Sequence, residues 1–147
     1  MRYETVFSVA NLLATVSWVV LAAGALVARF RTWALKWAGL AVPGLLGLAY
    51  LALVIAGREA FASGGYSSLQ AVRDLFANDA MLTAGWLHYL AFDLFVGAWI
   101  VREARDCGIP GWLILPHLLL TFMFGPIGLL LFLATRPFFD RPSSVQA

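Results

Sequence analysis

Four long apolar stretches limit what this chain can fold into. They cover residues 5–28, 37–56, 80–101 and 112–135, and each holds 20 to 24 residues. A helix needs about 20 apolar residues to cross the hydrocarbon core of a bilayer. The sequence is 62% hydrophobic, whereas soluble domains average about 45–50% apolar residues. We therefore expect an all-α fold, a four-transmembrane-helix bundle that forms one domain over residues 1–136, with a flexible tail at residues 137–147.

The connection between the second and third stretches, residues 57–79, contains signals for structure of its own. Ser67 followed by Gln70 has the spacing of a capping box, which opens a helix. Asn78 and Asp79 then offer an N-cap for the next helix. Between these signals, apolar residues recur on one helical face, as in helices that lie at a membrane surface; they are Leu69, Val72, Leu75 and Phe76. We expect a short interfacial helix here, in a connection ordered enough to serve as a lid.

Cysteine content and charge exclude several functions. Cys107 is the only cysteine, which excludes an intrachain disulfide and a cysteine metal cluster. The net charge of +2 is too small to indicate nucleic acid binding.

Basic residues are balanced between the two sides of the expected bundle. One side carries Arg29, Arg31, Lys36, Arg102 and Arg105, and the other carries Arg2, Arg58, Arg73, Arg136 and Arg141. Because the first hairpin often dominates orientation, its dense positive charge predicts that both termini lie outside.

The third stretch carries a histidine and a carboxylate, His88 and Asp93, near its middle. Each ionisable side chain at the centre of a bilayer costs at least a few kcal/mol. We therefore expect both residues to be retained for a function, and we treat them as the catalytic candidates. On a helix they diverge by about 140°, at ~100° per residue, so they need not touch but could flank a ligand.

Ser8, Asn11, Thr15 and the Gly125-Pro126 bend are expected to share the outer half of the bilayer with His88, with Thr15 at roughly its depth. In the first stretch, Glu4, Ser8, Asn11 and Thr15 share one helical face. In the fourth, Pro126 follows Gly125 and removes a helical hydrogen bond, which predicts a bend, and Pro43-Gly44 predicts a similar break in the second. Thr121 is the nearest expected hydrogen-bond partner of Asp93. Trp86 and Trp99 lie inside the third stretch, where they could line a site for a flat apolar molecule.

Other interpretations of these residues stay open or fail on geometry. His88 and Asp93 could be interhelical ties, and proton or ion translocation is also compatible with them. A haem held by His88 and His117 is disfavoured, because their expected depths differ by about 12 Å at 1.5 Å per residue. One histidine and one aspartate fall short of the three or four ligands that a zinc site requires.

Several strings resemble the "abscisic acid deficient four" family, whose plant members are tied to neoxanthin synthesis. They are the run from Gly85 to Gly97, Gly108-Ile109-Pro110, Pro116, the run from Leu120 to Leu130, Phe61-Ala62-Ser63-Gly64-Gly65 and Asn78-Asp79. The similarity covers nearly the whole chain. It departs at Gly111, where the family pattern leads us to expect a basic residue. The plastid transit segment of plant members is missing, which predicts a bacterial plasma membrane.

The resemblance implies a cofactor-free isomerisation of a carotenoid, in which an epoxide opens and an allene forms. Such a reaction needs an acid and a base, and His88 and Asp93 are the candidates. Asn11 and Tyr89 would orient polar end groups, and Trp86, Phe92 and Trp99 would contact the polyene. The predicted substrate-binding set is completed by Thr15, Thr121, Phe122, Gly125 and Pro126.

The expected partners are the lipid bilayer and a carotenoid or isoprenoid, not nucleic acid, and a homo-oligomer is compatible with the sequence. The alternatives are a non-catalytic binder of a pigment or lipid, and an accessory subunit of a larger membrane enzyme.

Overall fold

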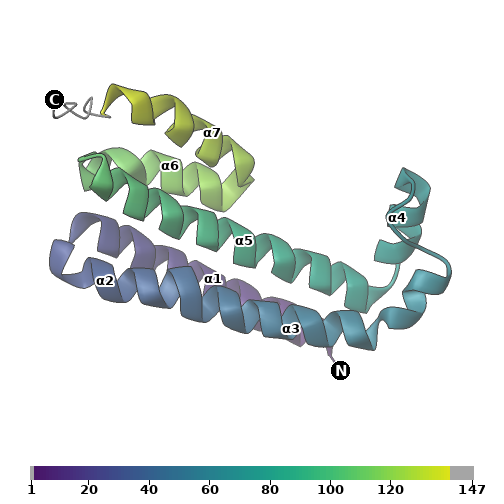
Figure 1. Ribbon diagram of the computed structural model, residues 1–147. Helices are drawn as coiled ribbons and strands as arrows, with labels where there is room; N and C mark the ends of the chain where they lie inside the picture. The colour runs from purple at the N-terminus through teal and green to yellow at the C-terminus, as the bar shows by residue number, and fades with distance from the viewer. Residues whose placement is uncertain (1, 140–147) are drawn as a thin grey trace, which may run out of the picture. The chain divides into compact units, whose positions relative to one another are not determined.

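A computed structural model describes residues 2–139, and every regular element in that part of the chain is helical. The predicted all-α class is therefore confirmed (Figure 1). In chain order the elements are α1 (Tyr3–Leu26), α2 (Ala28–Lys36), the π-helical η1 (Trp37–Ala41), α3 (Val42–Ala56), the 3₁₀ turn η2 (Arg58–Ala62), α4 (Leu69–Phe76), α5 (Asp79–Asp106), α6 (Gly111–Phe124), α7 (Pro126–Thr135) and the 3₁₀ turn η3 (Arg136–Phe138). The predicted tail begins at residue 137, but residues 137 and 138 belong to η3, and residues 140–147 of that tail lie outside the described residues.

Three helical segments in the described chain are long and apolar enough to cross a membrane. They are Tyr3–Leu26, Ala28–Ala56 and Asp79–Asp106, which agree with the first three predicted stretches and are typical of a multi-pass membrane protein. The second is longer than predicted, because α2, η1 and α3 follow one another without a break. Pro43 lies at the start of α3, where a missing N–H is tolerated. The π-helical turn just before it takes the place of the predicted break at Pro43-Gly44.

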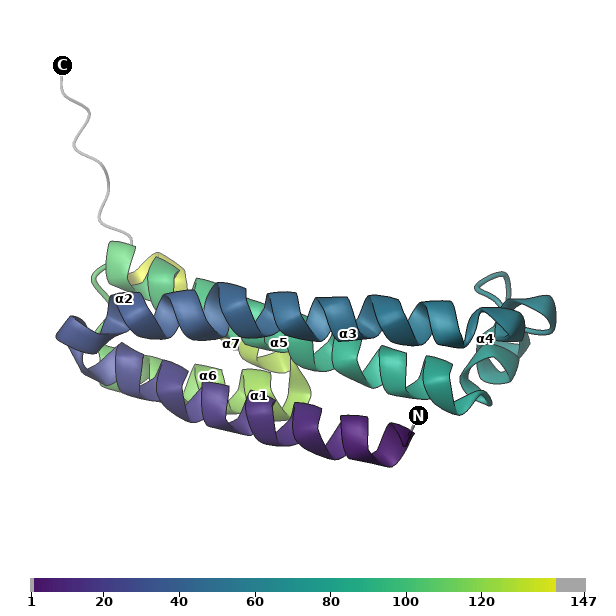
Figure 2. The ribbon, with the colours of Figure 1, turned by 90° about the horizontal axis from the view of Figure 1, so that it is seen from below.

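The fourth predicted helix, residues 112–135, is wrong as a single helix. The chain breaks at Gly125, where φ is 46° and ψ is −92°, and α7 starts afresh at Pro126. The proline supplies the fixed φ suited to a first helical turn. α6 and α7 then pack against each other as a helical hairpin (Figure 1), whereas α2 and α3 follow each other without a break (Figure 2). Pro116 lies inside α6 without ending it.

The chain divides into two compact units. Unit 1 contains the residues up to Val16 together with Ala41–Phe92. Unit 2 contains Ser17–Leu40 together with the chain from Asp93 onward. Both α1 and α5 contribute residues to each unit.

In unit 1 the long connection folds back on the helices that it joins. Leu75 of α4 is fully buried and packs in a cluster with Ala60, Met81 and Val54. Gly64 allows this close approach, because a Cβ there would collide with the Leu75 backbone. The predicted short helix in this connection is thus present as α4. Its N-cap is Ser68, which accepts a hydrogen bond from the Ala71 amide at 3.1 Å, and not the predicted Ser67.

The start of α5 is capped as predicted. Asn78 Oδ1 accepts hydrogen bonds from the amides of Ala80 at 3.0 Å and Met81 at 3.2 Å. These bonds satisfy two of the amides that a helix leaves unpaired at its first turn. The position of α5 relative to the long connection is therefore set by both this cap and the Leu75 cluster.

Unit 2 is built on close approaches at small residues. Gly97 of α5 lies against Trp18 and Leu21 of α1, and Gly39 lies against Ala98. In a membrane, where helices gain no hydrophobic advantage from association, such small residues let backbones pack closely. Phe132 of α7 is fully buried and its ring contacts Trp99 of α5 at 5.5 Å between centroids.

Candidate functional site

His88 lines a cavity of about 230 Å³ in unit 1. Its ring packs against Tyr50 of α3, with 5.8 Å between ring centroids, and stacks on Phe92 of α5 at 4.5 Å. Aromatic and aliphatic side chains form the rest of the wall: Tyr66, Phe76, Val54, Met81, Ala84 and Gly85. The cavity therefore combines one titratable imidazole with two phenol groups in apolar surroundings.

The long connection between α3 and α5 forms one wall of this cavity. The Phe76 ring, at the end of α4, lies against Gly85 of α5, where an added Cβ would be 2.9 Å from Phe76 Cε1. Tyr66 comes from the loop before α4 and packs edge-on against Phe61. Because Gly85 and His88 are three residues apart on α5, they share a helical face, so the connection contacts that face about one turn before the histidine.

His88 itself is exposed in the described chain. It lies nine residues beyond the start of α5 at Asp79, or about 14 Å along the helix axis at ~1.5 Å per residue. At that depth an exposed side chain on a membrane-crossing helix faces hydrocarbon or a molecule dissolved in it. The cavity beside His88 thus lies within the length of a candidate membrane-crossing helix.

A second, larger cavity of about 600 Å³ lies on the α1 side of α5 in the same unit. Its walls include Trp86 and Phe7, whose rings lie 5.5 Å apart. Glu4, Ser8, Tyr3, Asp79, Leu82 and Thr83 complete the lining. Two members of the predicted polar stripe, Glu4 and Ser8, are therefore cavity residues.

Three of the predicted substrate-binding residues form a cluster beside this second cavity. Trp86 Nε1 donates a hydrogen bond to Asn11 Oδ1 at 3.1 Å, and Asn11 Nδ2 donates to the Phe7 carbonyl at 2.7 Å. The Trp86 ring also packs on Tyr89 at 5.3 Å. Asn11, Trp86 and Tyr89 are thus brought together, whereas Thr15 is exposed on α1. His88 and Phe92 lie on the other side of α5.

Asp93 belongs to unit 2, where its carboxylate lies at the tip of the α6–α7 hairpin. A Cβ built on Gly125 would be 2.7 Å from Asp93 Oδ1 and 2.9 Å from Oδ2. The carboxylate therefore faces the start of α7, where the positive end of the helix dipole stabilises negative charge. His88 and Asp93, predicted as an acid–base pair, fall in different units.

The other predicted residues of unit 2 are mostly packing residues of the hairpin. Thr121 is fully buried and its hydroxyl donates to the His117 carbonyl at 2.7 Å. Its single proton is therefore used within α6 and not for the predicted bond to Asp93. Phe122 packs on Trp18 at 5.7 Å between centroids. Gly125 and Pro126 form the tip itself.

His117 ties the two helices of the hairpin together. It is buried, with Nδ1 3.0 Å from the Leu113 carbonyl and Nε2 3.0 Å from Thr135 Oγ1. Both ring nitrogens thus have protein partners, which agrees with a structural role.

Sequence reasoning missed Tyr50 and Tyr66 as site residues. Tyr50 is the only tyrosine in the apolar stretch 37–56, so its phenol in otherwise hydrocarbon-like sequence was an available signal. Tyr66 carries no such signal, because tyrosine in a connecting loop is ordinary. Only the folding of the connection onto α5 brings Tyr66 to the cavity.

A family model described as ABA DEFICIENT 4-like matches residues 5–132. The chain belongs to this family. The match begins in the first turn of α1 and ends within α7, and it contains every lining residue of the cavity beside His88 and all of the second cavity's lining except Tyr3 and Glu4. No curated protein and no solved structure matches the chain. The predicted resemblance to the family is confirmed.

Proposed function

We propose that this ABA DEFICIENT 4-like protein binds a carotenoid or related isoprenoid in the membrane and isomerises it without a cofactor. The observation that carries the proposal is the position of His88, an exposed imidazole within a membrane-crossing helix, on the wall of an aromatic cavity. Sites for small organic ligands usually measure about 300–1,000 Å³. A cavity of about 230 Å³ is smaller, which fits the end group of a long molecule whose remainder lies in lipid.

The proposed reaction has balanced chemistry and needs no oxidant or reductant. A C–O bond of the epoxide breaks while its oxygen gains a proton from an acid, and a neighbouring C–H bond loses its proton to a base as the allene forms. An imidazolium can serve as the acid and a neutral imidazole as the base, and proton transfer by a positioned side chain contributes about 10²–10⁴-fold to a rate. His88 is the proposed acid–base group at the cavity, and Asp93 is the proposed second group.

A non-catalytic binder is the second candidate, and one observation favours it. The Asp93 carboxylate lies against Gly125 at the start of α7, so charge stabilisation within the fold is a sufficient reason for a carboxylate at this position. In that case the cavity beside His88 would hold an unchanged pigment. Homo-oligomer formation and a bacterial plasma membrane location stay predictions under both candidates.

The deciding experiment uses a bacterium that produces violaxanthin and expresses the wild type or a variant. The purified protein is examined by visible spectrum and its pigments are extracted. For the enzyme, we expect the allenic isomer with the wild type, and a loss of conversion of about 100-fold or more with His88→Gln or Asp93→Asn while the pigment stays bound. Phe95→Leu, at another exposed position of α5, is the control and should convert normally.

Each other result has a defined meaning. Unchanged pigment bound to the wild type supports the binder. Full conversion by His88→Gln would show that His88 has no role in the reaction. Full conversion by Asp93→Asn would show that Asp93 has a structural role and not a catalytic one. If the folded wild type neither binds pigment nor converts it, both candidates are contradicted.

A further inference from the structure

The helices of the C-terminal hairpin are too short to cross a membrane. α6 has 14 residues and α7 has 10, which correspond to about 21 Å and 15 Å at 1.5 Å per residue. The hydrocarbon core is about 30 Å thick. Since the two helices are antiparallel neighbours, joined by the His117–Thr135 contact of 3.0 Å, the chain returns to the end of unit 2 from which α6 starts.

An ion pair fixes that return. Arg136, the first residue after α7, lies 2.7 Å from Glu103 near the end of α5. Arg102 and Arg105 flank this glutamate in sequence, and Cys107 follows in the loop before α6. Arg136 therefore lies at the same end of unit 2 as the α5–α6 loop, and not at the opposite side of the bundle as the sequence predicted.

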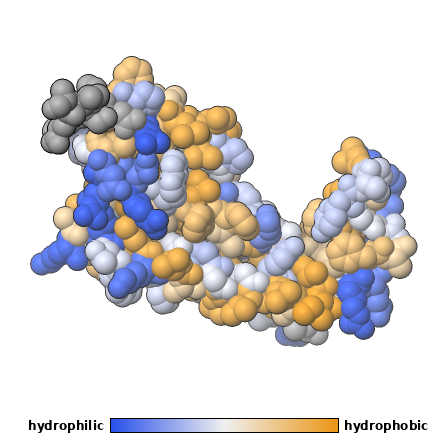
Figure 3. Space-filling view, in the orientation of Figure 1, coloured by the Kyte–Doolittle hydropathy of each residue, from blue (hydrophilic) through white to orange (hydrophobic). Residues whose placement is uncertain are grey.

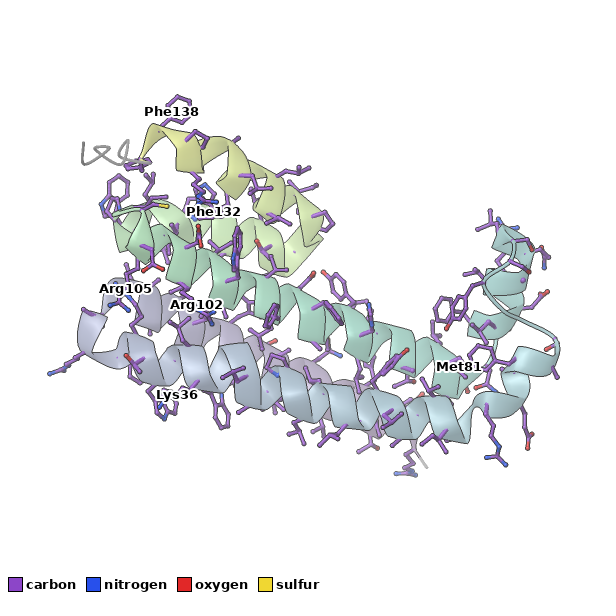
Figure 4. The ribbon with its side chains drawn as sticks, in the orientation of Figure 1. Lys36, Met81, Arg102, Arg105, Phe132 and Phe138 are labelled. Atoms are coloured by element: carbon purple, nitrogen blue, oxygen red, sulfur yellow. The ribbon has the colours of Figure 1, made fainter. Side chains whose placement is uncertain are left out.

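This end of unit 2 is strongly basic. Among the described residues it gathers six basic side chains and two acidic ones, Glu103 and Asp106. Figure 4 shows Lys36, Arg102 and Arg105 at this end, and Figure 3 shows the hydrophilic residues gathered there. Arg31 donates to the carbonyls of Gly24 and Ala25, both at 3.2 Å, and Arg136 binds Glu103, whereas four basic side chains are exposed: Arg29, Lys36, Arg102 and Arg105.

Unit 1 has slightly more acidic than basic side chains. Its described residues include three basic and four acidic side chains, namely Arg2, Arg58 and Arg73 against Glu4, Glu59, Asp74 and Asp79. Basic residues close to membrane helices favour the cytoplasmic side, where anionic lipid attracts them. The excess of basic residues in unit 2 therefore gives the orientation that the sequence count left balanced.

We infer that the chain crosses the membrane three times, that α6 and α7 form a re-entrant hairpin, and that the basic end of unit 2 contacts anionic phospholipid headgroups of the cytoplasmic leaflet. The start of α1 then lies outside and Arg136, after α7, lies inside, which replaces the prediction that both ends of the bundle's chain are outside. The inference is independent of the proposed enzyme activity, because it uses only helix lengths, the ion pair and the charge distribution.

Accessibility to a membrane-impermeant maleimide tests the crossings in intact and permeabilised cells. Cys107 reports on the α5–α6 loop, with Asp106→Cys in a Cys107→Ser background as a second reporter there. Ser144→Cys and Ser67→Cys in the same background report on the C-terminus and the long connection. We expect the loop and C-terminal cysteines to be protected until permeabilisation, and residue 67 to be labelled in intact cells.

Two results would overturn the inference. Labelling of residue 144 in intact cells, with protection at residues 106 and 107, means that the C-terminal segment crosses the membrane completely. Labelling of residues 106 and 107 in intact cells means that the basic end faces outside.

The lipid contact is tested with protein in nanodiscs of phosphatidylcholine, with or without phosphatidylglycerol. We expect the anionic lipid to raise the Tm of the wild type by ~3 °C or more, and the triple variant Arg29→Gln, Arg102→Gln, Arg105→Gln to lose this gain. The control, Arg58→Gln with Arg73→Gln in unit 1, should keep it. An equal gain in the triple variant, or no gain in the wild type, would contradict the contact.

Discussion

At the scale of single residues, the structure gives different surroundings to the two ionisable side chains of the third apolar stretch. The sequence singled out His88 and Asp93 by the same argument, the cost of ionisable groups in hydrocarbon. That argument applies to any ionisable group in hydrocarbon. It therefore could not distinguish His88, which lines a cavity, from Asp93, which faces the start of a helix. The separation depends on Gly125, whose contact with Asp93 arises only when the chain turns back.

Gly125 should tolerate no side chain. Its φ of +46° is unfavourable for other residues, and an added Cβ would collide with the Asp93 carboxylate. We expect Gly125→Ala to destabilise the protein by about 1–3 kcal/mol, measured by thermal unfolding in detergent. Gly44→Ala is the matched control, because nothing lies within 4 Å of the added Cβ; equal stability of the two variants would show that the tip is not strained.

At the scale of elements, hydropathy located the membrane helices well and the breaks poorly. Pro43, Pro116 and Pro126 all lie in apolar stretches, yet the chain turns back only at Gly125-Pro126. Hydropathy reports which residues avoid water, and it is equally satisfied by one long helix or by a hairpin. The hairpin is stabilised by contacts between residues far apart in sequence, such as Arg136 with Glu103.

The connection over His88 offers a test at the same scale. Leu75 is fully buried in the cluster that anchors α4, whereas Leu69 on the same helix is 69% exposed. Large-to-small changes in a core cost about 2–5 kcal/mol. We expect Leu75→Ala to detach α4 and to speed proteolysis of residues 57–78 at least 10-fold, with little effect from Leu69→Ala. Unchanged cleavage of Leu75→Ala would show that α4 is held by other contacts.

At the scale of the whole molecule, charge decides which way the chain is inserted. The sequence alone gave an even count, because a fourth crossing would carry Arg136 to the other side. The hairpin and the Arg136–Glu103 ion pair change this count to six basic residues at the end of unit 2 against three in unit 1, among the described residues. The orientation that we infer therefore depends on a tertiary contact.

Shifting the balance of charge should shift the orientation. The variant Arg102→Gln, Arg105→Gln, Ser63→Lys, Ser67→Lys changes the described count from six against three to four against five. We expect a substantial inverted population, measured by labelling of Ser144→Cys in intact cells in the Cys107→Ser background. The charge-conserving pair Arg102→Lys and Arg105→Lys should keep the wild-type orientation. A quadruple variant that inserts only in the original direction would assign orientation to some other feature.

The exposure of His88 on a membrane-crossing helix also affects how binding should be measured. Under the proposed function, a molecule that reaches this imidazole arrives sideways from the bilayer and does not pass through water. Its effective concentration is then its mole fraction among the lipids. Diluting a fixed amount of ligand with extra phospholipid should lower occupancy, even when the amounts of ligand and protein per volume of buffer stay the same.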